Sequence, residues 1–142
     1  MERAPEFRLP VLHGEPQEIA LSDYCGKVLL VNFWVTWCPA CQQELPQKEV
    51  FYRSLDNEQL AFITINVTGR EADPQQVKPY IAKHRLTFPV LRDKGTNTYD
   101  AYKVTSVPTT VLINPKGEIV NRYDETVPFV TVLEELGAYL NG

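Results

Sequence analysis

The chain has 142 residues, enough to bury a substantial hydrophobic core, and we expect residues 1–142 to form a single domain. Hydrophobic residues make up 44% of the sequence and charged residues 23%, as in an ordinary globular protein. The net charge is −4 and no run of lysine or arginine forms a patch, which argues against nucleic acid or an anionic membrane surface as a partner. No apolar run approaches the ~20 residues that a membrane-spanning helix needs.

The first half of the chain predicts a hairpin, two buried strands and a helix between those strands. Short apolar pieces broken by proline and glycine over residues 6–19 indicate a small hairpin or extended arm. Residues 28–34 and 60–67 are nearly continuous runs of β-forming apolar residues, typical of central strands covered on both faces. Pro39 opens a helical stretch that runs to about residue 55, since proline is tolerated in a first helical turn.

The second half continues the alternation of helix and strand, then closes with a hairpin and a helix. In order, it predicts a helix over 73–84, a strand over 88–91, a short helix over 95–102, strands over 109–113 and 118–123, and a final helix from about residue 126. This order predicts an α/β fold. Its sheet should be mixed, parallel where helices cross over and antiparallel at the last hairpin, with helices on both faces.

Two of the three cysteines, Cys38 and Cys41, stand three residues apart where the first central strand gives way to the helix. Residues at this helical spacing are neighbours at ~5–6 Å, within the Cα separation of ~4.4–6.8 Å that a disulfide accepts. The pair can therefore close a disulfide with little backbone movement. Because so small a ring removes little entropy from the unfolded chain, the bond suits a reversible redox couple better than a structural crosslink.

The position of each thiol in the helix suggests its role. Cys38 lies at the helix start, where unpaired amides and the positive end of the helix dipole favour an anion. We therefore assign Cys38 as the attacking thiolate and Cys41, deeper in the helix, as the resolving thiol. Glu44 follows Cys41 by one turn on the same face. It is either a solvated helix carboxylate or, if that face is covered, an acid with a raised pKa that exchanges a proton with Cys41.

Metal and haem sites fit the remaining residues less well. A zinc site would need more ligands, and only Cys25, His13 and His84 are spare, none of them in a second ligand pair. Covalent haem attachment would need histidine after Cys41, where glutamine stands. We expect no metal and no cofactor. We assign Cys25 no role, expecting a semi-buried small residue rather than a third redox thiol.

The stretch LSDYCGKVLLVNFWVTWCPACQQELP, residues 21–46, resembles the extracytoplasmic thiol-disulfide oxidoreductases of the TlpA/ResA/CcmG type, which are thioredoxin-like proteins. The Trp-Cys-x-x-Cys motif, the acid-x-Pro that follows it and the Val-Pro-Thr-Thr segment at 107–110 carry the likeness, which covers nearly the whole chain. The resemblance implies a thioredoxin fold, a redox-active disulfide between the two cysteines of the motif, and a helix-and-strand insert at about residues 66–91.

The resemblance also implies roles for residues around the thiols. Glu44 matches the family's acidic position and could replace the buried aspartate of thioredoxin, which is Asn32 here and cannot act as a base. A cis Val107–Pro108 bond is expected, with the Val107 backbone beside the disulfide and open to an extended substrate strand. We take Trp34 as a core residue and Trp37 as part of an exposed apolar rim on which partners dock. The residues expected to contact substrate are Trp37, Pro39, Val107 and Pro108.

The family's usual work is the reduction of disulfides outside the cytoplasm, with apocytochromes c among the targets and a membrane thiol transporter as electron donor. By this resemblance the protein is periplasmic or otherwise extracytoplasmic, membrane-anchored or secreted, and we expect a monomer. Residues 1–5 lack the apolar middle of a signal peptide, so the chain is either cytoplasmic or begins after a removed signal or anchor. Two alternatives stay open. One is a peroxidase of the same fold, which Thr36 fits and Cys41 does not; the other is a metal-carrying or binding module.

Overall fold

The computed structural model describes residues 2–56 and 58–141, and within them seven strands form one sheet in the order β2-β1-β5-β4-β3-β6-β7. The strands are β1 (Arg8–His13), β2 (Glu18–Ala20), β3 (Val28–Trp34), β4 (Leu60–Asn66), β5 (Val90–Arg92), β6 (Thr109–Ile113) and β7 (Ile119–Tyr123). The α-helices are α1 (Pro39–Arg53), α2 (Val77–Lys83), α3 (Asn97–Ala101) and α4 (Phe129–Asn141). Short 3₁₀ turns occur at η1 (Leu21–Tyr24), η2 (Thr68–Arg70) and η3 (Pro74–Gln76).

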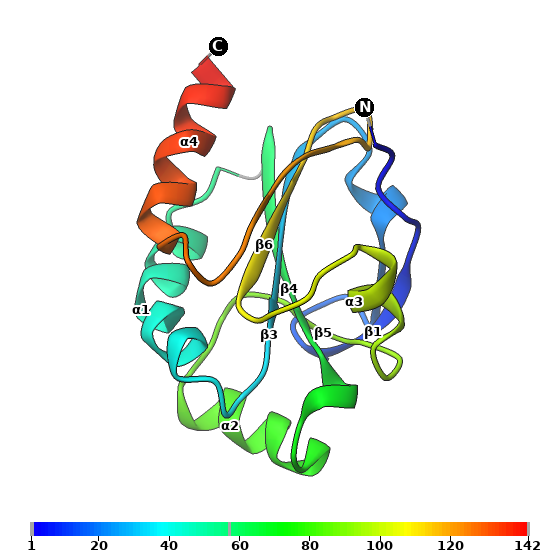
Figure 1. Cartoon of the computed structure of the whole chain (residues 1–142), viewed down its shortest axis with the longest axis vertical. Helices are drawn as coiled ribbons and strands as arrows, with labels where there is room; N and C mark the ends of the chain where they lie inside the picture. The colour runs from blue at the N-terminus through cyan, green and yellow to red at the C-terminus, as the bar shows by residue number, and fades with distance from the viewer. Residues whose placement is uncertain (1, 57, 142) are drawn as a thin grey trace.

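The sheet is mixed, as the order of elements predicts. β4 pairs in parallel with both β3 and β5, whereas β6 runs antiparallel to β3 and β7 antiparallel to β6. The N-terminal arm is a hairpin of β1 and β2, and β1 joins the sheet antiparallel to β5. Helices α1 and α4 lie against one face of the sheet, and α3 lies over the other (Figure 1). This arrangement confirms the predicted thioredoxin fold.

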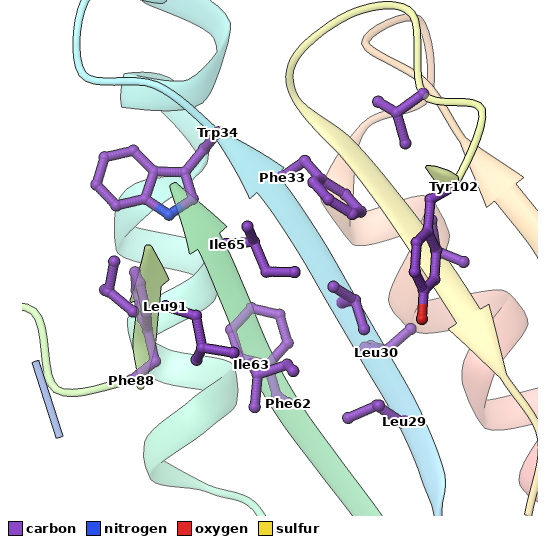
Figure 2. Packing of buried hydrophobic residues seen from close by; sticks show 14 of the residues in the cluster. Leu29, Leu30, Phe33, Trp34, Phe62, Ile63, Ile65, Phe88, Leu91 and Tyr102 are labelled. Atoms are coloured by element: carbon purple, nitrogen blue, oxygen red, sulfur yellow. The ribbon is translucent and has the colours of Figure 1, made fainter. Parts of the chain in front are cut away.

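Aromatic side chains fill the core on both faces of β3. Successive residues of a strand point to opposite faces, so Phe33 packs on Tyr102 with ring centroids 5.8 Å apart (Figure 2), while Trp34 packs on Tyr80, also at 5.8 Å. Beneath α1 and α4, a further cluster joins Phe51, Phe62 and Phe129. Every residue of β3 and β4 is buried, which explains their continuous apolar sequences.

Several predicted boundaries are wrong by a few residues. α2 begins at Val77 rather than at residue 73, because the 3₁₀ turn η3 precedes it, and side-chain hydrogen bonds explain two other differences. β5 begins at Val90 rather than at residue 88, because the amides of Thr87 and Phe88 donate to the carboxylate of Glu49 instead of to a strand. The last helix begins at Phe129 rather than near residue 126, since the amide and hydroxyl of Thr126 close a turn on the Asp124 carboxylate. Among the described residues, no helix combines the length and apolar character that crossing a membrane would require.

Two glycines bring distant loops into backbone contact next to β4. The Gly69 amide donates to the Gly95 carbonyl at 2.9 Å, which ties η2 to the loop before α3. A Cβ atom at Gly69 would lie 2.6 Å from the Gly95 carbonyl carbon, closer than real Cβ contacts allow. The approach of these two loops therefore depends on glycine at position 69.

We expect Gly69→Ala to lower the free energy of unfolding by ~1–3 kcal/mol, because the added methyl group overpacks against backbone that cannot turn away. Gly137→Ala is the matched control: no atom lies within 4 Å of a Cβ built there, and the site is inside α4. That change should raise the free energy of unfolding by ~0.5–1 kcal/mol, because alanine favours a helix over glycine. Urea unfolding of both variants measures the contrast, and equal effects of the same sign would contradict it.

Candidate active site

β3 and α1 place Cys38 just beyond the C-terminal end of a central strand of the sheet. β3 ends at Trp34, a short loop follows, and Cys38 is the N-cap of α1 with Pro39 in the first turn. The Cys38 sulfur accepts a hydrogen bond from the Cys41 amide at 3.1 Å. This amide is one of the N–H groups that a helix start leaves without a backbone partner, so the Cys38 sulfur takes the place of the usual Ser or Asp cap. A helix start with an amide donor of this kind is a typical position for the attacking cysteine of a redox pair.

The loop before β6 closes over the same sulfur. Cys38 Sγ lies 3.6 Å from the Val107 carbonyl oxygen, to which the thiol donates. The Val107–Pro108 peptide is cis, as predicted. Cys38 and Cys41 retain 5% and 1% of their surface, so Cys41 is the more protected thiol. The structure thus brings together four of the predicted site residues, although they come from segments 69 residues apart.

Cys41 is poorly suited to ionise unaided. Burial raises the pKa of the Cys41 thiol well above its usual range, and the hydrogen bond with the Cys38 sulfur acts in the same direction. The positive charge of Lys48 acts in the opposite direction. A resolving reaction by Cys41 therefore needs a group that takes its proton.

Glu44 occupies a largely covered position and is not a fully solvated helix carboxylate. Its side chain is 13% exposed, and burial raises the pKa of the Glu44 carboxyl while the charge of Lys48 lowers it. A groove of about 250 Å³ runs past this carboxyl between α1 and the segment after β7. Its lining includes Ala40, Gln43, Glu44, Pro108, Glu125 and Val127. Glu44 thus lies one helical turn beyond Cys41 with a route to solvent.

The predicted contact residues differ in exposure. Trp37 is 50% exposed and Pro39 is also exposed, whereas Val107 is half-buried and Pro108 is buried. The Trp37 indole N–H donates to the Arg70 carbonyl at 2.9 Å, which fixes the ring on the surface. An exposed tryptophan held in place beside a thiol can offer a rigid apolar surface to another chain.

Sequence reasoning missed Glu71, which anchors the loop before Cys38. Its carboxylate accepts from the Thr36 amide at 2.8 Å, from the Thr36 hydroxyl at 2.6 Å and from the Asn66 side-chain amide at 2.7 Å. These bonds hold the loop against the end of β4. No local pattern marks Glu71, because it lies in the segment after β4 and meets Thr36 only through the tertiary fold.

A second residue that sequence reasoning missed is Lys48, on the core-facing side of α1. Lys48 is fully buried, and its ammonium donates to the Asn32 side-chain oxygen at 3.0 Å; the Asn32 amide in turn donates to the Thr110 hydroxyl at 2.9 Å. A signal was present in the sequence. Lys48 follows Cys41 and Leu45 at the helical spacing of a core-facing row, where an apolar residue is the rule.

The remaining candidates lie elsewhere. Cys25 is exposed, not semi-buried as predicted, because it caps η1 at the protein surface. His13 is exposed, and the exposed His84 stacks on Tyr80 with ring centroids 4.3 Å apart. Across residues 2–56 and 58–141, no three His, Cys, Asp or Glu side chains are placed to share a metal ion.

We expect Cys41 to be the slowest of the three cysteines to react with iodoacetamide. Alkylation needs an accessible thiolate, and burial both covers this sulfur and raises the pKa of its thiol. In the reduced protein at about pH 8, mass spectrometry should find Cys41 modified at least ~10-fold more slowly than Cys38. The exposed Cys25 serves as the internal control for reagent activity. Equal labelling of Cys38 and Cys41 would contradict the difference between the two thiols.

Comparison with known proteins agrees with this geometry. The model of the AhpC/TSA family matches residues 1–122. Thiol-disulfide oxidoreductase ResA of Oceanobacillus iheyensis is 34% identical over 142 residues, covering 99% of this chain and 70% of that protein. Sporulation thiol-disulfide oxidoreductase A of Bacillus subtilis is 35% identical over 113 residues, covering 80% of this chain and 67% of that protein. The chain thus spans about two thirds of the length of these relatives.

Solved structures give the same result. StoA from Bacillus subtilis superposes with a TM-score of 0.75 at 31% identity, covering 84% of this chain and 87% of that one. The exposed lipoprotein thioredoxin Etrx1 of Streptococcus pneumoniae superposes with a TM-score of 0.81 at 25% identity, covering 94% and 99%. The capped thiol pair, the thioredoxin fold and these likenesses agree: the chain belongs to the AhpC/TSA family, among the thioredoxin-like thiol-disulfide oxidoreductases related to ResA.

Proposed function

We propose that this protein reduces disulfide bonds of other proteins outside the cytoplasm, using Cys38 as the nucleophile and Cys41 as the resolving thiol. The observation that carries the proposal is the position of the Cys38 sulfur at the N-cap of α1. There the sulfur accepts a hydrogen bond from the Cys41 amide and lies 3.6 Å from the Val107 carbonyl oxygen. The helix start and its amide donor are typical of an attacking cysteine, while burial raises the pKa of the Cys41 thiol, which therefore keeps its proton until a base removes it.

The reaction proceeds through a mixed disulfide. The Cys38 thiolate attacks one sulfur of the substrate disulfide; a new S–S bond forms and the other substrate sulfur leaves as a thiolate. Cys41 then gives up its proton to the Glu44 carboxylate and attacks the Cys38 sulfur. The Cys38–Cys41 disulfide forms and the substrate departs with its second thiolate, which takes up a proton. The protein loses two electrons and the substrate gains them.

The substrate segment is proposed to lie along the rim formed by Trp37, Pro39, Val107 and Pro108. Trp37 offers an exposed apolar surface, and the loop of Val107 offers backbone groups to an extended chain. Protein disulfides fit this open rim, and apocytochromes c are one class of such substrates. Electrons would return to Cys38–Cys41 from a membrane thiol donor.

Support for an extracytoplasmic location comes from a relative. The Streptococcus pneumoniae structure is described as an exposed lipoprotein, and its fold matches 94% of this chain. Disulfide substrates are abundant in oxidising compartments and rare in the cytoplasm. We therefore infer that the protein works outside the cytoplasm, anchored or secreted, and as a monomer.

We expect Cys38→Ser to abolish reduction of insulin disulfides by dithiothreitol-recycled protein, because no other thiol stands at a helix N-cap beside the Val107 carbonyl in the described chain. Insulin turbidity measures the rate. Cys25→Ser is the control and should retain it, since that exposed thiol lies outside the site. Full activity in Cys38→Ser, or peroxide turnover without disulfide reduction, would refute the proposed function.

The direction of electron flow is set by the reduction potential of the Cys38–Cys41 couple. A strong oxidant stabilises its reduced form, whereas the reductant proposed here needs a potential toward the reducing end of the range. We therefore expect a midpoint nearer to the ~−270 mV of thioredoxin than to the ~−120 mV of a strong oxidant. Equilibration with glutathione or dithiothreitol buffers measures it, and a value at the oxidising end would reverse the proposed direction.

A further inference from the structure

Lys48 is a charged side chain of α1, the helix that begins after Cys38, and it has no exposed surface. It lies on the core-facing row of α1 with Cys41 and Leu45, and its ammonium is within 5.9 Å of the ring centroids of both Trp34 and Phe88. Burying a cation among aromatic rings costs free energy unless other groups compensate its charge. Lysines are almost never fully buried, so the position calls for a physical reason.

The groups around the ammonium compensate its charge only in part. Asn32 accepts one hydrogen bond at 3.0 Å, and Glu44 Oε2 lies 4.0 Å from Lys48 Nζ, within ion-pair range but too far for a hydrogen bond. That Glu44 oxygen is itself buried and has no hydrogen-bond partner among the described residues. The charges of Lys48 and Glu44 therefore stabilise each other, and protonation of Glu44 would remove the negative charge that lies nearest to the ammonium.

The two thiols complete the set of titratable groups whose charges act on Lys48. The charges of Glu44, Cys41 and Cys38 each raise the pKa of Lys48, against the larger effect of burial, which lowers it. In return, the charge of Lys48 lowers the pKa of both Glu44 and Cys41. The ammonium thus favours negative charge on either partner.

Among the described residues, no cation other than Lys48 acts on Glu44 and Cys41. From α2, Tyr80 packs on Trp34 at 5.8 Å, and burial raises the pKa of its hydroxyl to about 12, so it is neutral near pH 7. Glu71 is engaged with the loop before Cys38. On α1 itself, Glu49 forms an ion pair with Arg53 at 3.3 Å and accepts from the Thr87 amide, away from Lys48.

We propose that Lys48 is a positioning residue for the resolving step: its ammonium, held by Asn32, compensates the negative charge on Glu44 before proton transfer and on the Cys41 sulfur after it. The inference rests on the proposed function. When the Cys41 proton moves to Glu44, the negative charge moves from carboxylate to sulfur, and Lys48 stays paired throughout. The thiolate then attacks the Cys38 sulfur of the mixed disulfide as described above, and the ammonium is neither consumed nor deprotonated.

The test separates the two thiol steps with dithiobis(nitrobenzoate) as the disulfide. Attack by Cys38 releases one thionitrobenzoate, and resolution by Cys41 releases a second, so stopped-flow absorbance reports each step in turn. All proteins carry Cys25→Ser, because that exposed thiol would also react. Lys48→Met keeps length and apolar stem but removes the charge, and replacing a buried charge by a hydrophobic residue often leaves stability intact.

Lys48→Met should leave the first release within ~2-fold of the parent, slow the second release ~10-fold near neutral pH, and move its pH profile upward by ~1 unit. Glu44→Gln should slow the second release as well. Lys48→Arg, which keeps the charge, should restore at least part of the rate. Lys83→Met, at an exposed site on α2, is the matched control and should change neither release. A purely structural role would lower stability without moving the pH profile.

The outcomes distinguish this inference from the proposed function. If Lys48→Met resolves at the parental rate with the parental pH profile, the role of Lys48 is wrong while the function stands. If the parent itself shows no second release, the function is wrong. A measurement on the unmutated chain covers the case in which Lys48→Met fails to fold. The Glu44 carboxyl carbon, followed by NMR, should shift a second time where the Lys48 ammonium loses its proton, and a single-step titration would overturn the coupling.

Discussion

The hydrogen bond from the Cys41 amide to the Cys38 sulfur is the contact on which the site depends. It exists because β3 delivers Cys38 to the point where α1 begins, and because the first turn of a helix leaves its amides unpaired. The sulfur thereby satisfies a backbone donor and gains a partial positive environment in the same contact. Any change that moved the start of α1 by one residue would lose both effects, since a different side chain would then occupy the N-cap.

The rigidity of that junction comes from the segments on either side of it. β3 is buried along its whole length between β4 and β6, so the point at which the strand ends is fixed by the core. The following loop is held by Glu71 through Thr36, and the Trp37 indole is bonded to the Arg70 carbonyl. Both anchors come from the segment between β4 and β5. This segment thus stabilises the redox site, although it supplies neither of the two thiols.

The sequence predicted the parts of this arrangement that local chemistry determines. The alternation of buried strands and helices, the antiparallel closing hairpin, the capping cysteine and the cis Val107–Pro108 bond can each be read from residue types, spacing or family likeness. Glu71 could not be found, because its contact with Thr36 joins residues 35 positions apart. The error at Cys25 has a similar origin, since a turn residue with apolar neighbours can face either way. Lys48 could have been noticed, because a lysine in a core-facing row conflicts with the pattern around it.

The two halves of thiol chemistry lie at different depths of α1. In the first turn, the Cys38 sulfur meets a backbone donor, the amide of Cys41. One turn further on, a backbone hydrogen bond at Val35 lowers the pKa of the Cys41 thiol, but burial outweighs it, so the charge of a side chain, Lys48, also matters there. Burial there penalises every ion, which is why carboxyl, thiol and ammonium affect one another so strongly. A buried, charged lysine on the helix that carries Cys41 lowers the stability of the fold. Under the role proposed for Lys48, function offsets this cost, because the ammonium compensates negative charge at a place that water does not reach.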